Sequence, residues 1–166
     1  LALAIGRGLG SRLDPGAVVL IGRDTRRSGA MLEAAVAAGL ASAGVNVELG
    51  GILPTPAVAE LVARGDQAAG VVISASHNPY PDNGIKLFGA DGFKLPDHEE
   101  AAVEAGMEAA GERPVADALG EIGGWQEGLN LYRDRLVERF PDALGQLRIV
   151  IDCAHGATVT TAVDVL

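Results

Sequence analysis

The chain has 166 residues, enough for one medium-sized domain with a hydrophobic core, or for one domain and part of another. Hydrophobic residues make up 48% of it and charged residues 21%, which argues against disorder, and no apolar run approaches the roughly 20 residues that cross a bilayer. The net charge of −9 opposes general binding to nucleic acid, so an anionic ligand must be held by a local group of cations.

The first residues of the chain (1–9) are apolar but lack a basic start, and Arg7 interrupts them, so we expect a helix here rather than a signal peptide. The single cysteine, Cys153, excludes a disulfide within the chain and offers no pair for a metal. One cysteine agrees with a reducing compartment, and we expect a cytoplasmic protein.

Strand and helix signals alternate along the chain, and this alternation predicts an α/β fold. We expect a three-layer α/β/α domain with a mixed sheet, followed by the start of a second, similar domain. The run 70–74 (GVVIS) is apolar on both faces, as expected of a central strand that helices cover on each side. In chain order, the expected elements are a helix over 1–13, a strand over 17–22, a helix over 28–43, a strand over 45–50, a helix over 55–65, strands over 70–74 and 85–88, and a helix over 97–110.

Residues with terminal preferences mark the ends of these helices. Ser28 and Thr55 are expected N-caps, and Gly44 is the expected C′ residue of the second helix. Asp97 and Glu100 form an approximate capping box for the helix that follows them.

The last third of the sequence suggests a domain boundary. Residues 111–124 are expected to form a surface connection, and 125–140 a helix that Pro141 ends. A strand, a turn and a helix are then expected within 147–166. We therefore predict one domain over 1–140 and the truncated beginning of a second α/β domain over 141–166.

The segment whose residues are best suited to catalysis or binding is the loop at 75–84 (ASHNPYPDNG), called here the serine loop. Its two prolines and its Asp-Asn-Gly turn signal prevent a helix or strand from passing through it. A serine at a strand end in such a stiffened loop, Ser76, is exposed and fixed, as a nucleophile or phosphate carrier must be. His77 and Lys86 could supply positive charge or move protons. Phosphoryl transfer depends mostly on positioning and charge neutralisation, so this group of residues fits that reaction class.

Two other classes of function compete with this interpretation. A serine hydrolase would need small glycines around its nucleophile, whereas Ala75 precedes Ser76 and His77 follows it. A non-catalytic phosphate- or nucleotide-binding domain would be expected to carry a standard cradle. The sequence has no Gly-x-Gly-x-x-Gly after a strand and no Walker-type Gly-Lys-Ser/Thr.

The segment SASHNPYPDNGIKLFGADGFKL (74–95) resembles the active-site segment of the α-D-phosphohexomutases, and its details look most like the phosphoglucosamine mutases among them. Segments similar to those of the family occur in the same order elsewhere in the chain: IGRDTRRSGAMLEAAVAAGLASAGVNV, GILPTPAVA and IVIDCAHGA. The resemblance therefore covers nearly the whole chain, as an N-terminal portion of such an enzyme.

The resemblance implies that phosphoserine at Ser76 donates its phosphate to a phosphosugar, and that the resulting bisphosphate reorients and returns the other phosphate. The net reaction would interconvert glucosamine 6-phosphate and glucosamine 1-phosphate. It also implies a Mg²⁺ ion bound by the phosphoserine and by aspartates of a motif that this chain does not contain. The loop that would recognise the sugar is also outside the chain, so a phosphomannomutase or phosphoglucomutase remains an alternative, as does a non-catalytic phosphosugar-binding domain.

The same resemblance implies roles for individual residues. Ser76, His77 and Lys86 would be catalytic, with Lys86 transferring a proton or stabilising charge. Asn78 would bind phosphate together with the two arginines of GRDTR, Arg23 and Arg26. Purely structural roles are expected for Cys153, His98 and His155, and a pairing role for Asp24.

Overall fold

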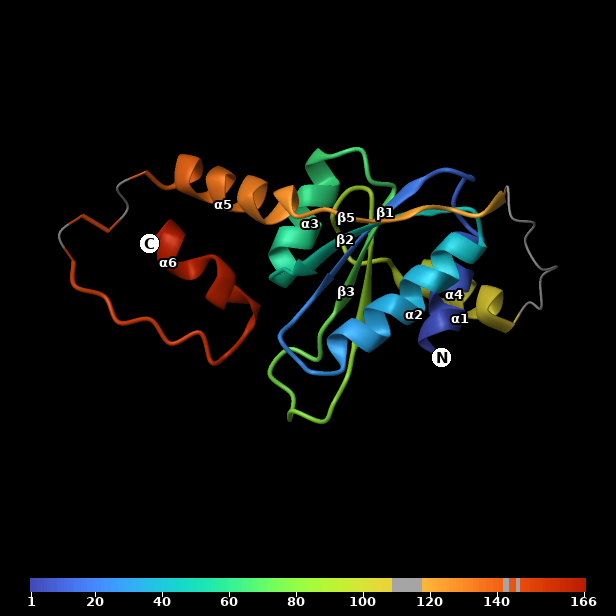
Figure 1. The fold of residues 1–166 in the computed structure, drawn as a ribbon, viewed down its shortest axis with the longest axis horizontal. Coiled ribbons are helices and arrows are strands. Elements are labelled where there is room, and N and C mark those ends of the chain that lie inside the picture. The colour runs from blue at the N-terminus through green and yellow to red at the C-terminus, as the bar shows by residue number, and fades with distance from the viewer. Residues whose placement is uncertain (109–117, 142–143, 146) are drawn as a thin grey trace.

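The computed structural model describes residues 1–108, 118–141, 144–145 and 147–166 (Figure 1). Five strands form one sheet in the order β4-β3-β1-β2-β5. The pairs β1–β2, β1–β3 and β2–β5 are parallel, whereas β4 runs antiparallel to β3. The sheet is therefore mixed, as predicted. Its strands are β1 (Val18–Arg23), β2 (Asn46–Ile52), β3 (Ala69–Ile73), β4 (Ile85–Gly89) and β5 (Ile122–Gly124).

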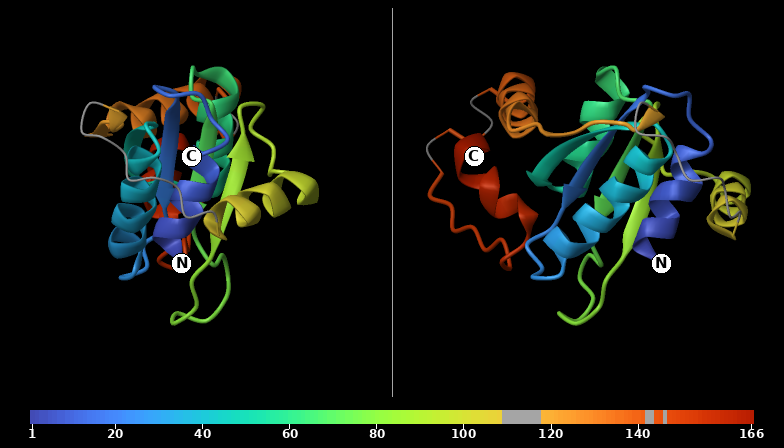
Figure 2. Two further views of the ribbon diagram at one scale, coloured as in Figure 1. Left: turned by 90° about the vertical axis from the view of Figure 1, so that its right-hand side faces the viewer. Right: turned by 45° about the vertical axis from the view of Figure 1, so that its right-hand side comes forward.

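Helices cover both faces of this sheet, which confirms the predicted three-layer α/β/α architecture (Figure 2). Helices α1, α2 and α4 pack on the face that carries Val19 and Ile21 of β1. Helices α3 and α5 pack on the opposite face, which carries Leu20. Successive side chains of a strand point to opposite faces, so β1 contributes to both halves of the core. The helices are α1 (Ala2–Gly10), α2 (Gly29–Ser42), α3 (Thr55–Arg64), α4 (Asp97–Glu108), α5 (Glu127–Arg139) and α6 (Ala162–Val165), with a short 3-10 helix, η2 (Ala157–Thr160).

Strand β3 carries the serine loop at its end, and it lies at the centre of the core. All five of its residues are buried, as predicted for a strand covered on both sides. The continuous apolar run keeps this strand fixed between its two neighbours. The loop that follows it is consequently anchored to a fully buried strand.

Helices α1 and α2 cross with their backbones in close contact. A Cβ atom added to Gly39 would lie 2.2 Å from the carbonyl oxygen of Leu3, and one added to Gly6 would lie 2.2 Å from that of Val36. Only glycine fits at such a crossing, because any side chain would overlap the facing backbone. The two glycines therefore set the distance between the helices on this face.

The predicted helix ends are only partly correct. Gly44 has φ +82°, which confirms it as the residue that ends α2. Ser28 is the N-cap residue of α2, as predicted, but its hydroxyl donates to Asn83 Oδ1 in the serine loop and makes no cap hydrogen bond. The N-cap of α3 is Pro54, so that Thr55 is already helical. The carboxylate of Glu100 pairs with Lys94, 3.1 Å away, rather than completing a capping box.

Strand β5 corrects the prediction of a surface connection over 111–124. Its residues pair with β2 from Val47↔Ile122 to Leu49↔Gly124. Two of the three residues of β5 are glycines, so the sequence showed no strand pattern here. A contact next to the strand supports the pairing instead: Asn46 Oδ1 accepts from the amide of Glu121 at 2.9 Å. Residues 109–117, which include the predicted end of α4, lie outside the described residues.

The strand predicted at the start of 147–166 is wrong in this structure. Residues 147–153 form no strand, and the side chain of Val150 is 98% exposed. A strand requires a neighbour to accept and donate its backbone hydrogen bonds, and within the described residues none lies beside this segment. The turn and helix that follow are present as η2 and α6. Within the described residues, no helix is both long enough and apolar enough to cross a membrane.

Candidate functional site

Ser76 lies just beyond the carboxyl end of β3, beside the equivalent end of its parallel neighbour β1. This edge of an α/β sheet is where ligands characteristically bind. Ser76 has φ +56°, a left-handed conformation that costs a residue with a side chain about 1–2 kcal/mol. Its backbone amide donates to Ser74 Oγ at 3.0 Å. The serine is therefore exposed and held in a strained conformation, a combination typical of functional sites.

Lys86 reaches the hydroxyl of this serine from the neighbouring strand. Its Nζ lies 3.1 Å from Ser76 Oγ and 3.1 Å from the carbonyl oxygen of Ser74. The antiparallel pairing of β3 and β4 makes this possible, since it places Lys86 opposite Val72, near the end of β3. The structure thus brings together two of the three predicted catalytic residues. An ammonium group at this position favours negative charge on or near the serine oxygen.

Arg26 binds the backbone of the serine loop. Its Nη1 and Nη2 atoms donate to five carbonyl oxygens at 2.8 to 3.1 Å, and its Nε donates to Asp24 Oδ2 at 3.0 Å. All three guanidinium nitrogens are therefore engaged, which a flexible ammonium group could not reproduce. A direct contact from Arg26 to phosphate stays a prediction, and the observed contacts favour a role through the loop. The five acceptors belong to Ser76, Asn78, Pro79, Tyr80 and Asp82.

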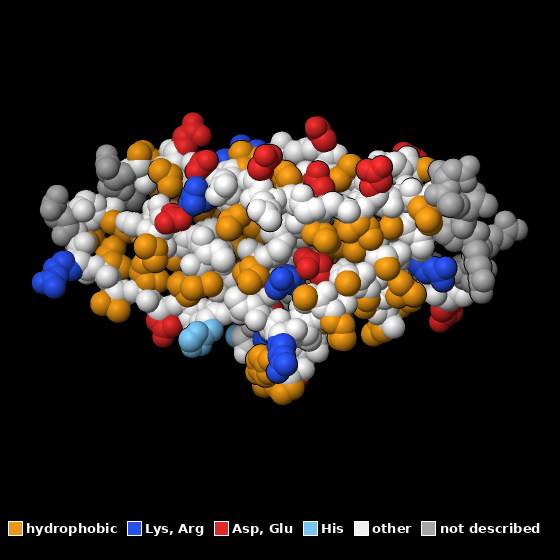
Figure 3. Space-filling view, viewed as in Figure 1, with side chains coloured by type: hydrophobic (Ala, Val, Ile, Leu, Met, Phe, Trp, Pro, Cys, Tyr) orange, Lys and Arg blue, Asp and Glu red, His pale blue; other side chains and the backbone are white. Residues whose placement is uncertain are grey.

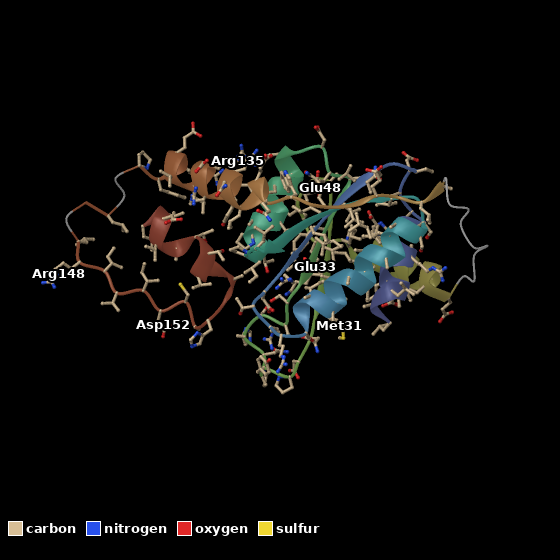
Figure 4. The ribbon with its side chains drawn as sticks, viewed as in Figure 1. Met31, Glu33, Glu48, Arg135, Arg148 and Asp152 are labelled. Atoms are coloured by element: carbon tan, nitrogen blue, oxygen red, sulfur yellow. The ribbon has the colours of Figure 1, made fainter. Side chains whose placement is uncertain are left out.

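Arg23, the last residue of β1, pairs with a carboxylate of α2. Its Nε donates to Glu33 Oε2 at 3.1 Å. Glu33 is 8% exposed, and its second oxygen has no hydrogen-bond partner among the described residues (Figure 4). The pair ties the end of β1 to α2, immediately before Asp24 and Arg26. The predicted phosphate contact of Arg23 stays a prediction.

His77 and Asn78 are exposed and line a cleft of about 1030 Å³. Ser74 and Ser76 line the same cleft, and so do Thr55 and a C-terminal segment (153–159). Figure 3 shows hydrophobic and Lys or Arg side chains on the projection at the lower edge of the molecule, with histidine beside that projection. The cleft therefore offers space and positive charge next to the serine hydroxyl.

The C-terminal wall of this cleft was not predicted from the sequence. Ala154 has φ +46° and His155 has φ +54°, so two successive residues are left-handed. Asp152 supports this turn by accepting the amide of Ala154 at 2.8 Å (Figure 4), and the hydroxyl of Thr25 donates to the carbonyl of His155. His155 is a turn residue, as expected, but it also lines the cleft. Only the Asp-x-Ala spacing in IVIDCAHGA hinted at such a turn.

Across the described part of the chain, no group of three or more His, Cys, Asp or Glu side chains is placed to hold a metal ion. The carboxylate of Asp24, which lines the cleft, accepts from the backbone amide and Nε of Arg26, each at 3.0 Å. Asp24 thus has the pairing role expected for it.

Comparison with known proteins gives consistent matches. The family model described as "Phosphoglucomutase/phosphomannomutase, alpha/beta/alpha domain I" matches residues 1–114. The chain is 50% identical to the phosphoglucosamine mutase of Frankia alni over 98% of its own length and 36% of that protein. It is 51% identical to the phosphoglucosamine mutase of Burkholderia multivorans over 98% of its length and 37% of that protein. The chain therefore spans a little over a third of the length of these relatives.

Solved structures agree with these matches. A phosphoglucomutase/phosphomannomutase family protein from Burkholderia thailandensis has a TM-score of 0.68 and 28% identity, with 84% of this chain and 31% of that chain covered. The parafusin (phosphoglucomutase) structure from Paramecium has a TM-score of 0.74 over 97% of this chain and 36% of that one. At 17% identity, the second likeness concerns the fold alone.

Proposed function

Since this chain belongs to the phosphoglucomutase/phosphomannomutase family, of which it carries α/β/α domain I, we propose that it is the serine-bearing part of a phosphoglucosamine mutase. In this proposal, phosphoserine 76 passes its phosphoryl group to glucosamine 6-phosphate. The resulting bisphosphate reorients in the site and returns its other phosphate to Ser76, leaving glucosamine 1-phosphate. The observation that carries the proposal is the contact of 3.1 Å between Lys86 Nζ and Ser76 Oγ in a cleft at the carboxyl end of the sheet.

Each step needs a charge to be neutralised and a proton to be moved. Lys86 is placed to stabilise the serine oxygen when the phosphoryl group leaves it. His77 lines the cleft beside Ser76 and is free to exchange a proton with the sugar hydroxyl that enters or leaves. Asn78 would hold phosphate oxygens from the same loop. Arg23 and Arg26 complete the proposed phosphate site by fixing β1 and the serine loop around it.

A magnesium ion fits this site only through Ser76. Magnesium takes close to octahedral coordination from oxygen ligands, and the phosphate carried by Ser76 would supply one of them. The metal would neutralise the transferring phosphoryl group. The remaining ligands would come from residues outside this chain.

The domain organisation is part of the same proposal. Residues 1–140 would form the domain that bears the serine loop, and 141–166 would begin a second α/β domain. The exposed apolar residues of 147–151 support this division, because such a run is normally covered by neighbouring strands and helices. We place the enzyme in the cytoplasm, with a phosphorylated hexosamine as its partner.

The test is a pair of substitutions in the protein at the full length of its relatives. Ser76→Ala should abolish turnover of glucosamine 6-phosphate, because alanine has no hydroxyl group to carry the phosphate. Ser74→Ala should retain substantial activity, since Ser74 is 9% exposed and contributes only a hydroxyl that accepts the amide of Ser76. Mass spectrometry should locate phosphate on residue 76 alone. Equal losses in the two variants would contradict the assignment, and faster turnover of mannose or glucose 6-phosphate would favour the alternative substrates.

A further inference from the structure

The contacts of Arg26 fix the direction of several peptide groups in the serine loop. Five carbonyl oxygens from Ser76 to Asp82 converge on one guanidinium group. A backbone segment of seven residues whose carbonyl groups point to one centre is neither a helix nor a strand. The left-handed conformation of Ser76 is part of this arrangement, since the carbonyl of Ser76 is among the five.

A peptide group is planar, and in its trans form the N–H points opposite to the C=O. The chain has no cis peptide bond among the described residues. The amide N–H of His77 is therefore directed away from Arg26, because the carbonyl of Ser76 is directed toward it. This N–H has no hydrogen-bond acceptor among the described residues, whereas the amide of Asn78 donates to Ala75 at 3.1 Å and that of Asp82 donates to Pro79 at 3.0 Å.

We propose that the backbone amide of His77 is a binding group for the phosphoryl group on Ser76, and that Arg26 is the positioning residue that orients it. The proposal rests on the function proposed above for Ser76. A peptide N–H fixed before the reaction stabilises developing negative charge without any cost of reorientation. Such a donor also remains in place while the side chain of His77 exchanges protons.

This assignment changes how the arginine takes part in the site. In this assignment Arg26 acts on the phosphate through the loop, since its three nitrogens contact loop carbonyls and Asp24. Its positive charge instead gathers the negative ends of five peptide dipoles, and the positive end of the peptide group between Ser76 and His77 is turned to the other side. One partly buried cation thereby makes a neutral backbone group attractive to an anion.

Selective labelling with [15N]histidine tests the proposal in the protein at the full length of its relatives. The His77 amide signal is assigned by its loss in His77→Gln, and mass spectrometry verifies the phosphate on Ser76. On phosphorylation, we expect the amide proton of His77 to move downfield, as it does when an N–H donates to a charged oxygen. The amide signals of His98 and His155 should move much less. A separate [15N]asparagine label should show that the Asn78 amide, already bonded to Ala75, also moves much less.

The arginine is tested by Arg26→Lys, which keeps the charge but cannot bridge five carbonyls. In phosphorylated protein, this variant should lose most of the downfield shift of His77, while Arg27→Lys, at an exposed neighbouring position, should keep it. If Ser76 is phosphorylated in the unsubstituted protein and the chemical shift of the His77 amide does not change, this inference is overturned while the proposed function stands. Failure of Ser76 to take phosphate would overturn the proposed function and this inference with it. An unchanged shift in folded Arg26→Lys protein would remove the role of Arg26.

Discussion

Lys86 contacts Ser76 Oγ in the serine loop and the carbonyl oxygen of Ser74 just before it, and its proposed role can be separated from that of an ordinary surface lysine. Lys86→Ala should lower kcat by roughly 10²–10⁴-fold, the range typical of a group that moves a proton or stabilises charge. Lys94→Ala should change kcat little, because Lys94 pairs with Glu100 at 3.1 Å and makes no contact recorded with the serine loop. Steady-state kinetics of the two variants provide the measurement. Indistinguishable losses would remove the role of Lys86.

Tyr132 on α5 gives the molecule an expected dependence on alkaline pH. Burial raises the pKa of its hydroxyl, and the nearby carboxylate of Glu60 raises it further, while Arg139 partly opposes this. The unfolded chain therefore loses this proton at a lower pH than the folded protein does. Stability contributed by the neutral hydroxyl is full below about pH 10, the usual pKa of tyrosine, and declines as the pH rises beyond it.

Tyr132→Phe has no proton to lose and should flatten this decline. Denaturant midpoints measured from pH 8 upward would test it, with exposed Tyr80→Phe as the matched control. If both variants followed the same curve as the unsubstituted protein, the buried tyrosine would not be the cause of alkaline destabilisation.

For individual residues, the sequence predicted which side chains would lie together in the site but not the contacts that hold them there. Ser76 and Lys86 could be placed together because a turn signal between two apolar runs predicts a hairpin. The contacts of Arg26 could not be predicted, because they join positions fifty or more residues apart through carbonyl groups that every residue carries. The left-handed conformation of Ala154 was equally hidden, since alanine rarely adopts it, whereas histidine, the residue type at 155, is enriched in that conformation.

Among the helices, the crossing of α1 and α2 is the contact most sensitive to a single methyl group. Gly39→Ala should destabilise the protein by roughly 1–3 kcal/mol, because the new Cβ would lie 2.2 Å from the carbonyl oxygen of Leu3 and the helices would have to separate. In an exposed helix the same change would normally stabilise, by about 1 kcal/mol. The expected sign is therefore reversed by packing.

Chemical denaturation followed by circular dichroism would measure this change in the free energy of unfolding. Gly123→Ala is a suitable control, since a Cβ at Gly123 would have no heavy atom within 4 Å. A stabilised Gly39→Ala variant would mean that α1 and α2 are farther apart in solution.

The elements that could be predicted are those with a strong pattern of their own. Strand β3 is apolar at every position, and α2 lies between a serine and a glycine, so both were located to within one or two residues. Strand β5 depends entirely on its partner β2, and its sequence IGG carries no periodic signal. The segment 147–153 shows the opposite case. Its pattern is that of a strand, but it forms none, because the described residues offer it no partner.

For the chain as a whole, we expect a folded but catalytically silent protein. Each face of the sheet packs against a layer of helices over its own core cluster, so we expect the fold to form without further domains. Catalysis requires several metal ligands and a cradle for the distal phosphate of the sugar, and the described residues contain no metal-binding cluster.

A coupled assay for hexose 1-phosphate, with Mg²⁺ and a bisphosphate activator, would test the purified chain, and circular dichroism would establish that it is folded. Turnover comparable to that of a full-length relative would mean that the essential metal and substrate groups lie within these 166 residues after all.

The position of Cys153 in the wall of the cleft makes the site accessible to chemical labelling. It is the one cysteine among the 166 residues, it is partly exposed, and it shares the cleft with Ser76 and His77. A fluorophore attached through a thiol-selective reagent would therefore sit at a single known position beside the serine loop. Its emission would report on what enters the cleft, without any engineered cysteine in this chain.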